Sequence, residues 1–463
     1  MLNNVKEDKL NEKKLISNVS KIKQELTDID SYNKENNWIL SDELNLITRK
    51  IREIEPFGFY DDVLTEGLYL SYENSEDSVA SVCVIRKNER PILVTSTSSS
   101  PHNIRVSTNF DNDSSLMSAK AFKQIQKGKT VDLRSVDQQI EDIIRNHLFL
   151  ETNEEYLVVK RWIEATYFYD IFDAFPILFI NGLSGTGKSR LLEIIYMLSY
   201  HGKAMTEPTI AAFFRTISKF KPTLTIDEGE QISDNENLRR VLNSCYTKSG
   251  STIIRCVGDN YIPTEFNFYG PVAIASINPL YYVTQNRTIR IQMIDARQNY
   301  PHPNSYECDK IRDNLYQLRL KEPFKVREIY KTIDMNNIVT ARFEELFIPL
   351  FTIANLFGTQ EEWKVLADWA KKYEKDCRSS SINNSPEADI LSATIIAYEI
   401  TNTDGWIYIS TITNISNNQY GQNRFNPRTI SGILRLLGFE IGRDGTGTKV
   451  YISKSKLDNL KSR

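Results

Sequence analysis

The spacing of hydrophobic positions changes several times along the chain, and each change predicts a different kind of element. In residues 1–60, apolar side chains recur every three or four positions, as at Leu44, Ile47, Ile51 and Ile54, which predicts a helical arm. Residues 61–135 instead hold short β-rich runs between polar clusters, followed by a helical segment. This pattern predicts a small β or α+β domain.

Residues 136–335 alternate helical patterns with short apolar runs at 176–181, 223–226 and 271–277. Such runs, bounded by turn residues, favour buried strands of a parallel sheet with helices on its faces. A helical extension is predicted over 336–378, and the serine- and asparagine-rich residues 379–386 predict a linker. The last segment, 387–463, has the helix, helix, hairpin outline of a winged helix.

Composition narrows the class of protein. The 463 residues include 57 Lys and Arg against 60 Asp and Glu, for a net charge of −3, and 40% are hydrophobic, as in core-forming globular chains. Five scattered cysteines without a CxxC pair, and four histidines, argue against a zinc site. The polar start MLNNVKEDKL and the short apolar run 174–180 lead us to expect a cytoplasmic protein without a membrane span.

The first apolar strand leads directly into GLSGTGKS and a helical segment, which is the context that a phosphate-binding loop requires. Backbone amides of the turn and helix N-terminus would face the phosphates of ATP, Lys188 would reach the β and γ phosphates, and Ser189 would ligate Mg²⁺. The residues expected to bind nucleotide here are Gly182, Ser184, Gly185, Thr186, Gly187, Lys188 and Ser189.

The second strand ends in Asp227 and Glu228, thirty-nine residues after Lys188. Asp227 would hold Mg²⁺, and Glu228 would polarise the attacking water. An acidic turn without catalytic function is the alternative. The third strand ends in Asn278, which could orient the same water or simply form the turn before Pro279.

Arg287 and Arg290 follow in TQNRTIRIQ. Either could stabilise transition-state charge in a neighbouring subunit, or remain a solvated surface arginine.

At these motifs the chain resembles the AAA+ ATPase modules of plasmid and phage primase-helicase proteins, a group close to superfamily 3 helicases. The resemblance rests on strings such as FFRTISKFKPTLTIDEGE and VAIASINPLYYVTQNRTIRIQ, and covers about residues 140–373 plus the C-terminal segment. It implies an α/β P-loop core that hydrolyses ATP in a hexameric ring. By the same resemblance Asn278 matches a sensor, Arg287 the arginine finger and Arg342 a second sensor. Residues 1–135 show no primase-polymerase motif.

Two regions are candidates for nucleic-acid contact. A hairpin predicted between the second and third strands would face the ring pore by resemblance, with Lys248 and Arg255 at phosphates and Tyr261 stacked on a base. An ordinary edge hairpin is equally compatible with the pattern. In the C-terminal segment, a flexible wing is expected at 445–447, and the candidates are Arg424, Arg428, Arg435 and Lys449.

Two functions of different classes follow. One is an ATP-dependent helicase or DNA-remodelling ring that acts on single-stranded or forked DNA during replication of a plasmid, virus or integrated mobile element, with a primase or other replication proteins as partners. The other is a regulatory or assembly ATPase that binds DNA or a partner through its winged helix without unwinding. Fork unwinding with DNA-stimulated ATP hydrolysis distinguishes the two.

Overall fold

The computed structural model describes residues 39–41, 46–48, 52–60, 63–71, 78–87, 89, 91–95, 104–107, 110, 113, 115–206, 209, 212–213, 215–217, 221–230, 232, 235–257, 262–384, 386–420 and 425–461. The chain forms two compact units, Met1–Asn112 and Asp113–Arg463. This boundary precedes the helix α2 (Ala119–Gln126), which the sequence pattern predicts in the same domain as the β-rich runs. Helix α2 packs on α10 (Ser305–Lys321), so it belongs to the second unit.

The first unit is built from antiparallel strands and one parallel strand pair. Its largest sheet has the order β4-β5-β6-β7, and Val63, Leu68 and Val82 are buried in it. Its strands are β1 (Ile39–Ser41), β2 (Leu46–Thr48), β3 (Arg52–Ile54), β4 (Gly58–Tyr60), β5 (Val63–Ser71), β6 (Ser78–Arg86), β7 (Ile92–Thr95) and β8 (Ile104–Val106).

The predicted helical arm needs correction over its second half, where β2 and β3 replace the expected helix. Strand β3 pairs in parallel with β8, about fifty residues away in the chain. Pairing across such a separation overrides a local spacing carried by only four apolar residues, and β-branched residues such as Ile54 favour strands. The first half of the arm lies outside the described residues.

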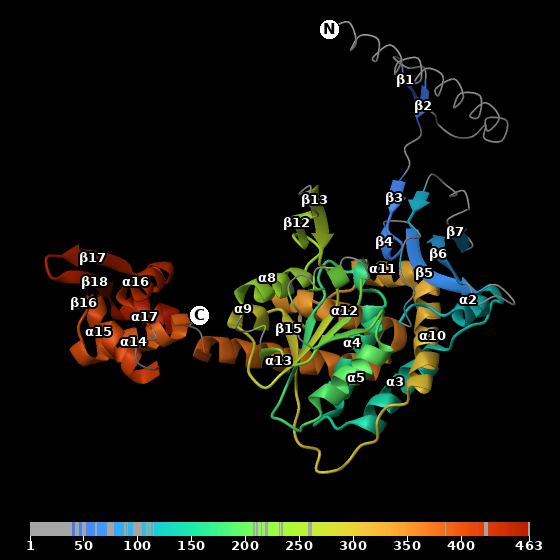
Figure 1. Cartoon of the computed structure of the whole chain (residues 1–463). Helices are drawn as coiled ribbons and strands as arrows, with labels where there is room; N and C mark the ends of the chain where they lie inside the picture. The colour runs from blue at the N-terminus through green and yellow to red at the C-terminus, as the bar shows by residue number, and fades with distance from the viewer. Residues whose placement is uncertain are drawn as a thin grey trace, which may run out of the picture. The chain divides into compact units, whose positions relative to one another are not determined.

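The second unit contains a parallel sheet of five strands in the order β10-β11-β14-β9-β15. Figure 1 shows β15, the strand at one edge of this sheet, among the helices of the unit. The strands are β9 (Ile177–Asn181), β10 (Lys203–Met205), β11 (Leu224–Ile226), β14 (Val272–Ser276) and β15 (Thr288–Gln292). Strands β9, β11 and β14 confirm the three predicted apolar runs, and their buried residues show why the runs are continuous rather than alternating. The fold is thus compatible with a P-loop α/β core.

Helices pack around this parallel sheet. Helix α5 packs on β11 and β14, and a cluster that includes Leu224, Ile274 and Leu242 forms part of the core. The helices are α3 (Leu133–His147), α4 (Asn153–Thr166), the 3-10 turn η2 (Tyr169–Ile171), α5 (Lys188–Leu198), α8 (Glu236–Cys245), α9 (Tyr282–Gln285), α10, α11 (Pro323–Thr332), α12 (Arg342–Phe357) and α13 (Gln360–Asn384). None of the described helices is both long and apolar enough to cross a membrane.

The hairpin predicted between the second and third motif strands is confirmed. Strands β12 (Thr252–Val257) and β13 (Ile262–Asn267) pair antiparallel in a continuous register. Its expected turn at 258–260 lies outside the described residues.

The predicted linker over 379–386 is largely helical, because α13 continues to Asn384. The Ser379 hydroxyl donates to the Lys375 carbonyl oxygen one turn earlier, and Arg378 pairs with Glu374 at 2.7 Å. These bonds within the helix satisfy polar side chains whose composition alone suggested a flexible segment.

The C-terminal segment combines four helices with a small antiparallel sheet of order β16-β18-β17. Its core includes Ile390, Ile412, Leu434 and Val450. The elements are α14 (Pro386–Thr401), β16 (Gly405–Tyr408), α15 (Ile409–Tyr420), α16 (Pro427–Leu436), β17 (Glu440–Asp444), β18 (Gly447–Ile452) and α17 (Lys454–Lys461).

A buried charge cluster joins α3, α4 and α13. Lys160 Nζ lies 2.9 Å from Asp137 and 3.2 Å from Glu362, and Arg161 lies 2.6 Å from Glu164. Glu164 is fully buried, and desolvation raises the pKa of its carboxyl to about 8 against the attraction of Arg161. The folded chain therefore keeps the Glu164 proton to a higher pH than the unfolded chain does.

We predict that this proton makes stability depend on pH. Between pH 4.5 and 8 the unfolded chain has lost the Glu164 proton while the folded chain keeps it, so the free energy of unfolding falls as pH rises. Glu164→Gln is neutral at every pH, and relative to the wild type it should gain up to about 1.4 kcal/mol per pH unit in this window. Denaturation midpoints from pH 5 to 8 measure the difference, with the exposed Glu361→Gln as control. A pH-independent difference for Glu164→Gln would contradict the assignment.

Candidate nucleotide site

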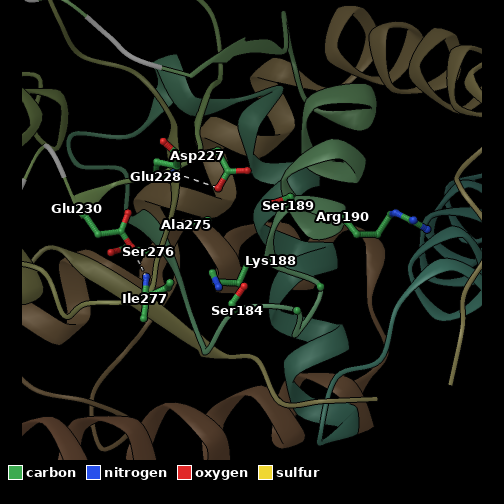
Figure 2. A pocket seen from close by; sticks show the side chains of 12 residues that line it. Ser184, Lys188, Ser189, Arg190, Asp227, Glu228, Glu230, Ala275, Ser276 and Ile277 are labelled. Carbon is green, nitrogen blue, oxygen red and sulfur yellow. Dashed lines mark hydrogen bonds between the residues drawn. The ribbon is translucent and has the colours of Figure 1, made fainter. Parts of the chain in front are cut away.

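The phosphate loop lies between the end of β9 and the start of α5, at one side of a cavity of about 690 Å³. The cavity lining includes Ser184, Gly185, Gly187, Lys188 and Ser189. Figure 2 shows Ser184, Lys188 and Ser189 across the cavity from the ends of β11 and β14, with the Arg190 side chain pointing away.

Two glycines are required by the local geometry of this loop. A Cβ at Gly182 would lie 2.6 Å from the Met293 carbonyl oxygen and 2.7 Å from Thr186 Oγ1, so any side chain would displace the loop. Gly187 has φ +92° and is the N-cap of α5, a conformation that L side chains rarely adopt. The helix therefore begins with its free backbone amides directed at the cavity.

Lys188 closes the loop on itself. Its Nζ donates to the carbonyl oxygens of Gly182 and Leu183, both at 2.8 Å. Thr186 Oγ1 donates to the Leu183 carbonyl oxygen at 2.8 Å as well. The ammonium group is thus held at the loop by weakly basic acceptors, which stronger anionic oxygens could replace.

The acidic pair predicted at the end of the second strand reaches the same cavity. Asp227 and Glu228 both line it. Glu228 has φ +57°, a strained left-handed conformation for a residue with a side chain, costing on the order of 1 kcal/mol. The Asp227 carboxylate accepts a hydrogen bond from the Glu228 amide at 3.0 Å, and the Gly229 amide donates to the Ala275 carbonyl oxygen at 2.8 Å. These two bonds hold the turn.

Glu230 is a cavity residue that the sequence analysis missed. Its carboxylate accepts a hydrogen bond from the Ile277 amide, just beyond the end of β14 (Figure 2). Partial burial acts to raise the pKa of Glu230, but the bond from Ile277 and further bonds from Ser276 and Asn278 outweigh it and lower the pKa. Glu230 therefore ties the acidic loop after β11 to the end of the third motif strand.

Asn278 follows β14 and is exposed, and its carbonyl oxygen accepts from Ser276 Oγ at 2.8 Å. The cavity lining reaches Ile277, one residue before Asn278. Asn181 fixes the same strand end from the other side, because its amide nitrogen donates to the carbonyl oxygens of Ser276 and Ile277 at 3.0 Å each. The structure therefore brings Asn278 to the edge of the cavity.

Arg287 and Arg342 do not line the phosphate-loop cavity. Arg287 precedes β15, whose first residue pairs with Ile177 at the start of β9, so it lies about 16 Å along the strands from the loop. Partial burial and then the charge of Arg342 lower the pKa of Arg287, which shows that the two arginines are neighbours. Arg342 lines a separate cavity of about 770 Å³, and its guanidinium lies over the Tyr246 ring. Neither arginine reaches the chain's own loop.

Arg290 is exposed within β15, and its backbone amide donates to the Tyr373 hydroxyl at 3.0 Å. It lies on the strand itself rather than on the segment that leads into it.

The predicted pore residues are only partly described. Lys248 Nζ donates to the Asp170 carbonyl oxygen, which anchors this lysine to the body of the domain before β12 begins. Arg255 lies on β12 and pairs with Thr264 of β13. Tyr261 lies outside the described residues.

In the C-terminal segment, Arg428 and Arg435 are exposed on α16, and Arg424 lies outside the described residues. Lys449 forms an ion pair with Asp444 and lies 5.4 Å from the centre of the Tyr408 ring. The expected flexible wing is a tight turn, because Asp444 also accepts from the amides of Thr446 and Gly447.

The residues present fit Mg²⁺ bound together with a nucleotide. Ser189 and Asp227 line one cavity, and Mg²⁺ in such sites takes one or two protein ligands plus phosphate oxygens. Within the described part of the chain, no group of three or more His, Cys, Asp or Glu side chains is placed to hold a metal by itself.

A third cavity, of about 430 Å³, shares Gly185, Gly187 and Arg190 with the phosphate-loop cavity. Its other side is formed by the end of α3, near His147 and Phe149, and by the segment after β15. The phosphate loop thus has open space on both of its flanks.

No protein-family model and no curated protein matches this chain. Among solved structures, the chain is similar to one described as "SCCmec type IV Cch - active helicase", with 12% sequence identity and a TM-score of 0.42 over 92% of this chain and 100% of that one.

We predict that Glu230 protects the Ile277 amide from exchange with solvent. Ile277 is 49% exposed, and the Glu230 carboxylate accepts the hydrogen bond from its amide. Glu230→Ala should speed its hydrogen exchange roughly tenfold, the equivalent of about 1.4 kcal/mol for a hydrogen bond to a charged group. Glu230→Gln should retain most of the protection, because its amide oxygen can still accept. Equal exchange in the wild type and Glu230→Ala would show that the bond contributes nothing in solution.

Proposed function

We propose that the chain is an ATP hydrolase that works as a helicase or DNA-remodelling motor. The observation that carries the proposal is the meeting of a phosphate loop, Lys188 and two carboxylates at one cavity. A binding protein for phosphate would need the loop and the lysine, but not an exposed glutamate held in a strained conformation beside them.

Each residue has a distinct part in this reaction. The loop amides and the start of α5 bind the phosphates, and Lys188 exchanges its two loop carbonyls for β and γ phosphate oxygens. Ser189 and Asp227 hold Mg²⁺, which supplies charge neutralisation when bound. Glu228 polarises the water that attacks the γ-phosphate, and Asn278 orients that water from the end of β14. The nucleoside extends into the third cavity, of about 430 Å³, beside Gly187.

The position of Arg287 favours a ring. Because Arg287 and Arg342 lie at the edge of the sheet opposite the phosphate loop, they can meet a γ-phosphate only in a neighbouring copy. A head-to-tail interface of this kind repeats around a closed ring. We therefore infer a homo-oligomer, with six copies by the resemblance to AAA+ modules, in which Arg287 is the finger and Arg342 acts in trans beside it.

The C-terminal segment is inferred to be a winged helix. Its order of helix, strand, two helices and hairpin, with the β16-β18-β17 sheet, supports this inference. In the proposed motor this unit and the β12–β13 hairpin are the parts that contact DNA, and unwinding of a forked duplex coupled to ATP hydrolysis is the activity that tests the motor as a whole.

Glu228→Gln and Lys188→Ala should separate hydrolysis from binding. Glu228→Gln should lose hydrolysis at least 100-fold and still bind ATP, because Asp227, Ser189 and Lys188 remain. Lys188→Ala should lose both, since among the described cavity residues no other cation faces the loop carbonyls. Turnover and equilibrium binding of a fluorescent ATP analogue measure the two effects. Equal loss of binding in both variants would refute this division of roles.

Mixing inactive variants tests the ring. Arg287→Ala and Lys188→Ala should each be inactive, because a trans arginine is worth about 10³ to 10⁵ in rate. An equal mixture that exchanges subunits should recover up to about a quarter of wild-type ATPase, the share of interfaces that join an intact loop to an intact finger.

The matched control is a mixture of Lys188→Ala with Glu228→Gln. Both changes fall in the same cavity of one subunit, so every site in the mixture lacks either Lys188 or Glu228 and no activity should return. Subunit exchange is followed directly by energy transfer between labelled copies. If exchange occurs and the first mixture stays inactive, Arg287 is not the finger, and Arg290 takes its place in the same test.

A further inference from the structure

A groove of about 420 Å³ lies between α16 and the β17–β18 hairpin of the C-terminal segment. Three arginines line it: Arg428 and Arg435 from the helix, and Arg443 from β17. Arg443 was not among the residues that the sequence analysis selected. All three are exposed, and none forms an ion pair with a residue in the described part of the chain.

The helix presents its arginines to the groove for a structural reason. Ile430 and Leu434 are completely buried and fix one face of α16 against the core. Arg428 and Arg435 are seven residues apart, or two turns, so they lie on one line about 10 Å apart along the helix. The core packing therefore holds two positive charges in a row, with Arg443 facing them from the strand.

Carboxylates nearby do not neutralise this row. Asp444 is next to Arg443 in sequence but pairs with Lys449 and caps the hairpin turn. Residues 387–463 carry nine Lys and Arg against seven Asp and Glu, in a chain whose net charge is −3. Three of these nine cations thus line the groove.

Gly432 lies between the two helical arginines, and because it has no side chain it leaves space at the bottom of the groove. Nothing lies within 4 Å of where its Cβ would be, so the fold itself would accept a side chain there. A glycine inside a helix costs about 1 kcal/mol relative to alanine. The packing of the unit does not require a glycine here. A ligand whose backbone lies close to the helix at this position would require one.

We propose that this groove binds the sugar-phosphate backbone of double-stranded nucleic acid, an inference that deepens the DNA contact in the proposed function and rests on it. Arginine forks bind phosphate oxygens in pairs, and a row about 10 Å long suits an extended polyanion rather than a single small phosphate. No aromatic side chain lines the groove, whereas sites for single strands stack bases on aromatic rings. An exposed helix of this width also fits the major groove of a duplex.

The test measures binding of the full-length protein without nucleotide to a 30-base-pair duplex and to a 30-nucleotide thymidine strand over a range of salt concentrations. Arg435→Gln and Arg443→Gln should each weaken duplex binding and reduce the slope of log affinity against log salt by about 0.9. The matched control is Lys454→Gln, an exposed cation of the same unit outside the groove lining, which should bind as the wild type does.

Gly432→Leu tests the groove without changing charge. A Cβ at this position meets no heavy atom within 4 Å and leucine favours helix, so thermal stability should not fall, while duplex affinity should drop at least fivefold because the side chain occupies the groove. Unchanged duplex affinity and salt slope in Arg435→Gln/Arg443→Gln would overturn the proposal. So would loss of single-strand binding alone, or the absence of duplex binding in the wild type.

The proposal and the motor fail separately. Lys188→Ala should bind the duplex normally, because its defect lies at the phosphate loop. Groove-dependent duplex binding in a chain that does not hydrolyse ATP would support the groove and refute the motor. Hydrolysis of ATP with groove variants that bind the duplex like the wild type would refute the groove alone.

Discussion

The parallel register of β9, β11 and β14 is the constraint on which the candidate site depends. Because β14 lies between β9 and β11, the three carboxyl ends meet at one edge of the sheet, although they come from residues 181, 226 and 276. Ligands of open α/β sheets bind at this edge, where the chain reverses its order of strands. The loop, the acidic pair and the Asn278 turn are therefore brought together by backbone pairing, before any side chain makes a contact.

The sequence predicted this part of the fold well for a physical reason. Strands buried on both faces read as continuous apolar runs, and a glycine loop between such a run and a helix has few other structures available. Glu230 escaped prediction because its role depends on a partner, the Ile277 amide, forty-seven residues away. The left-handed turn at Glu228 also depends on distant contacts, since Gly229 bonds to Ala275 on the neighbouring strand.

Local pattern failed where neighbours in space, rather than in sequence, decide the outcome. The strand at Arg52–Ile54 exists because Ile104–Val106 pairs with it, and Lys449 is engaged because Asp444 lies across a tight hairpin turn. Arg443 was overlooked for the converse reason. Alone in β17 it is an ordinary strand arginine, and it becomes part of a row of charges only when α16 packs beside it.

The order of the elements also shows how the proposed motor would pass a change at the nucleotide to DNA. The β12–β13 hairpin is inserted between β11, which leads to Asp227, and β14, which leads to Asn278. The base of the hairpin is held by bonds from the Phe268 amide to the Ser251 carbonyl oxygen and from the Gly270 amide to the Cys245 carbonyl oxygen. Glu230 joins the same two strand ends at the cavity. A shift of the acidic loop during hydrolysis would thus act on both strands that support the hairpin, while Arg287 at the opposite edge would sense the neighbouring copy. In the proposed motor, hydrolysis, DNA contact and subunit contact would then be linked through a single sheet.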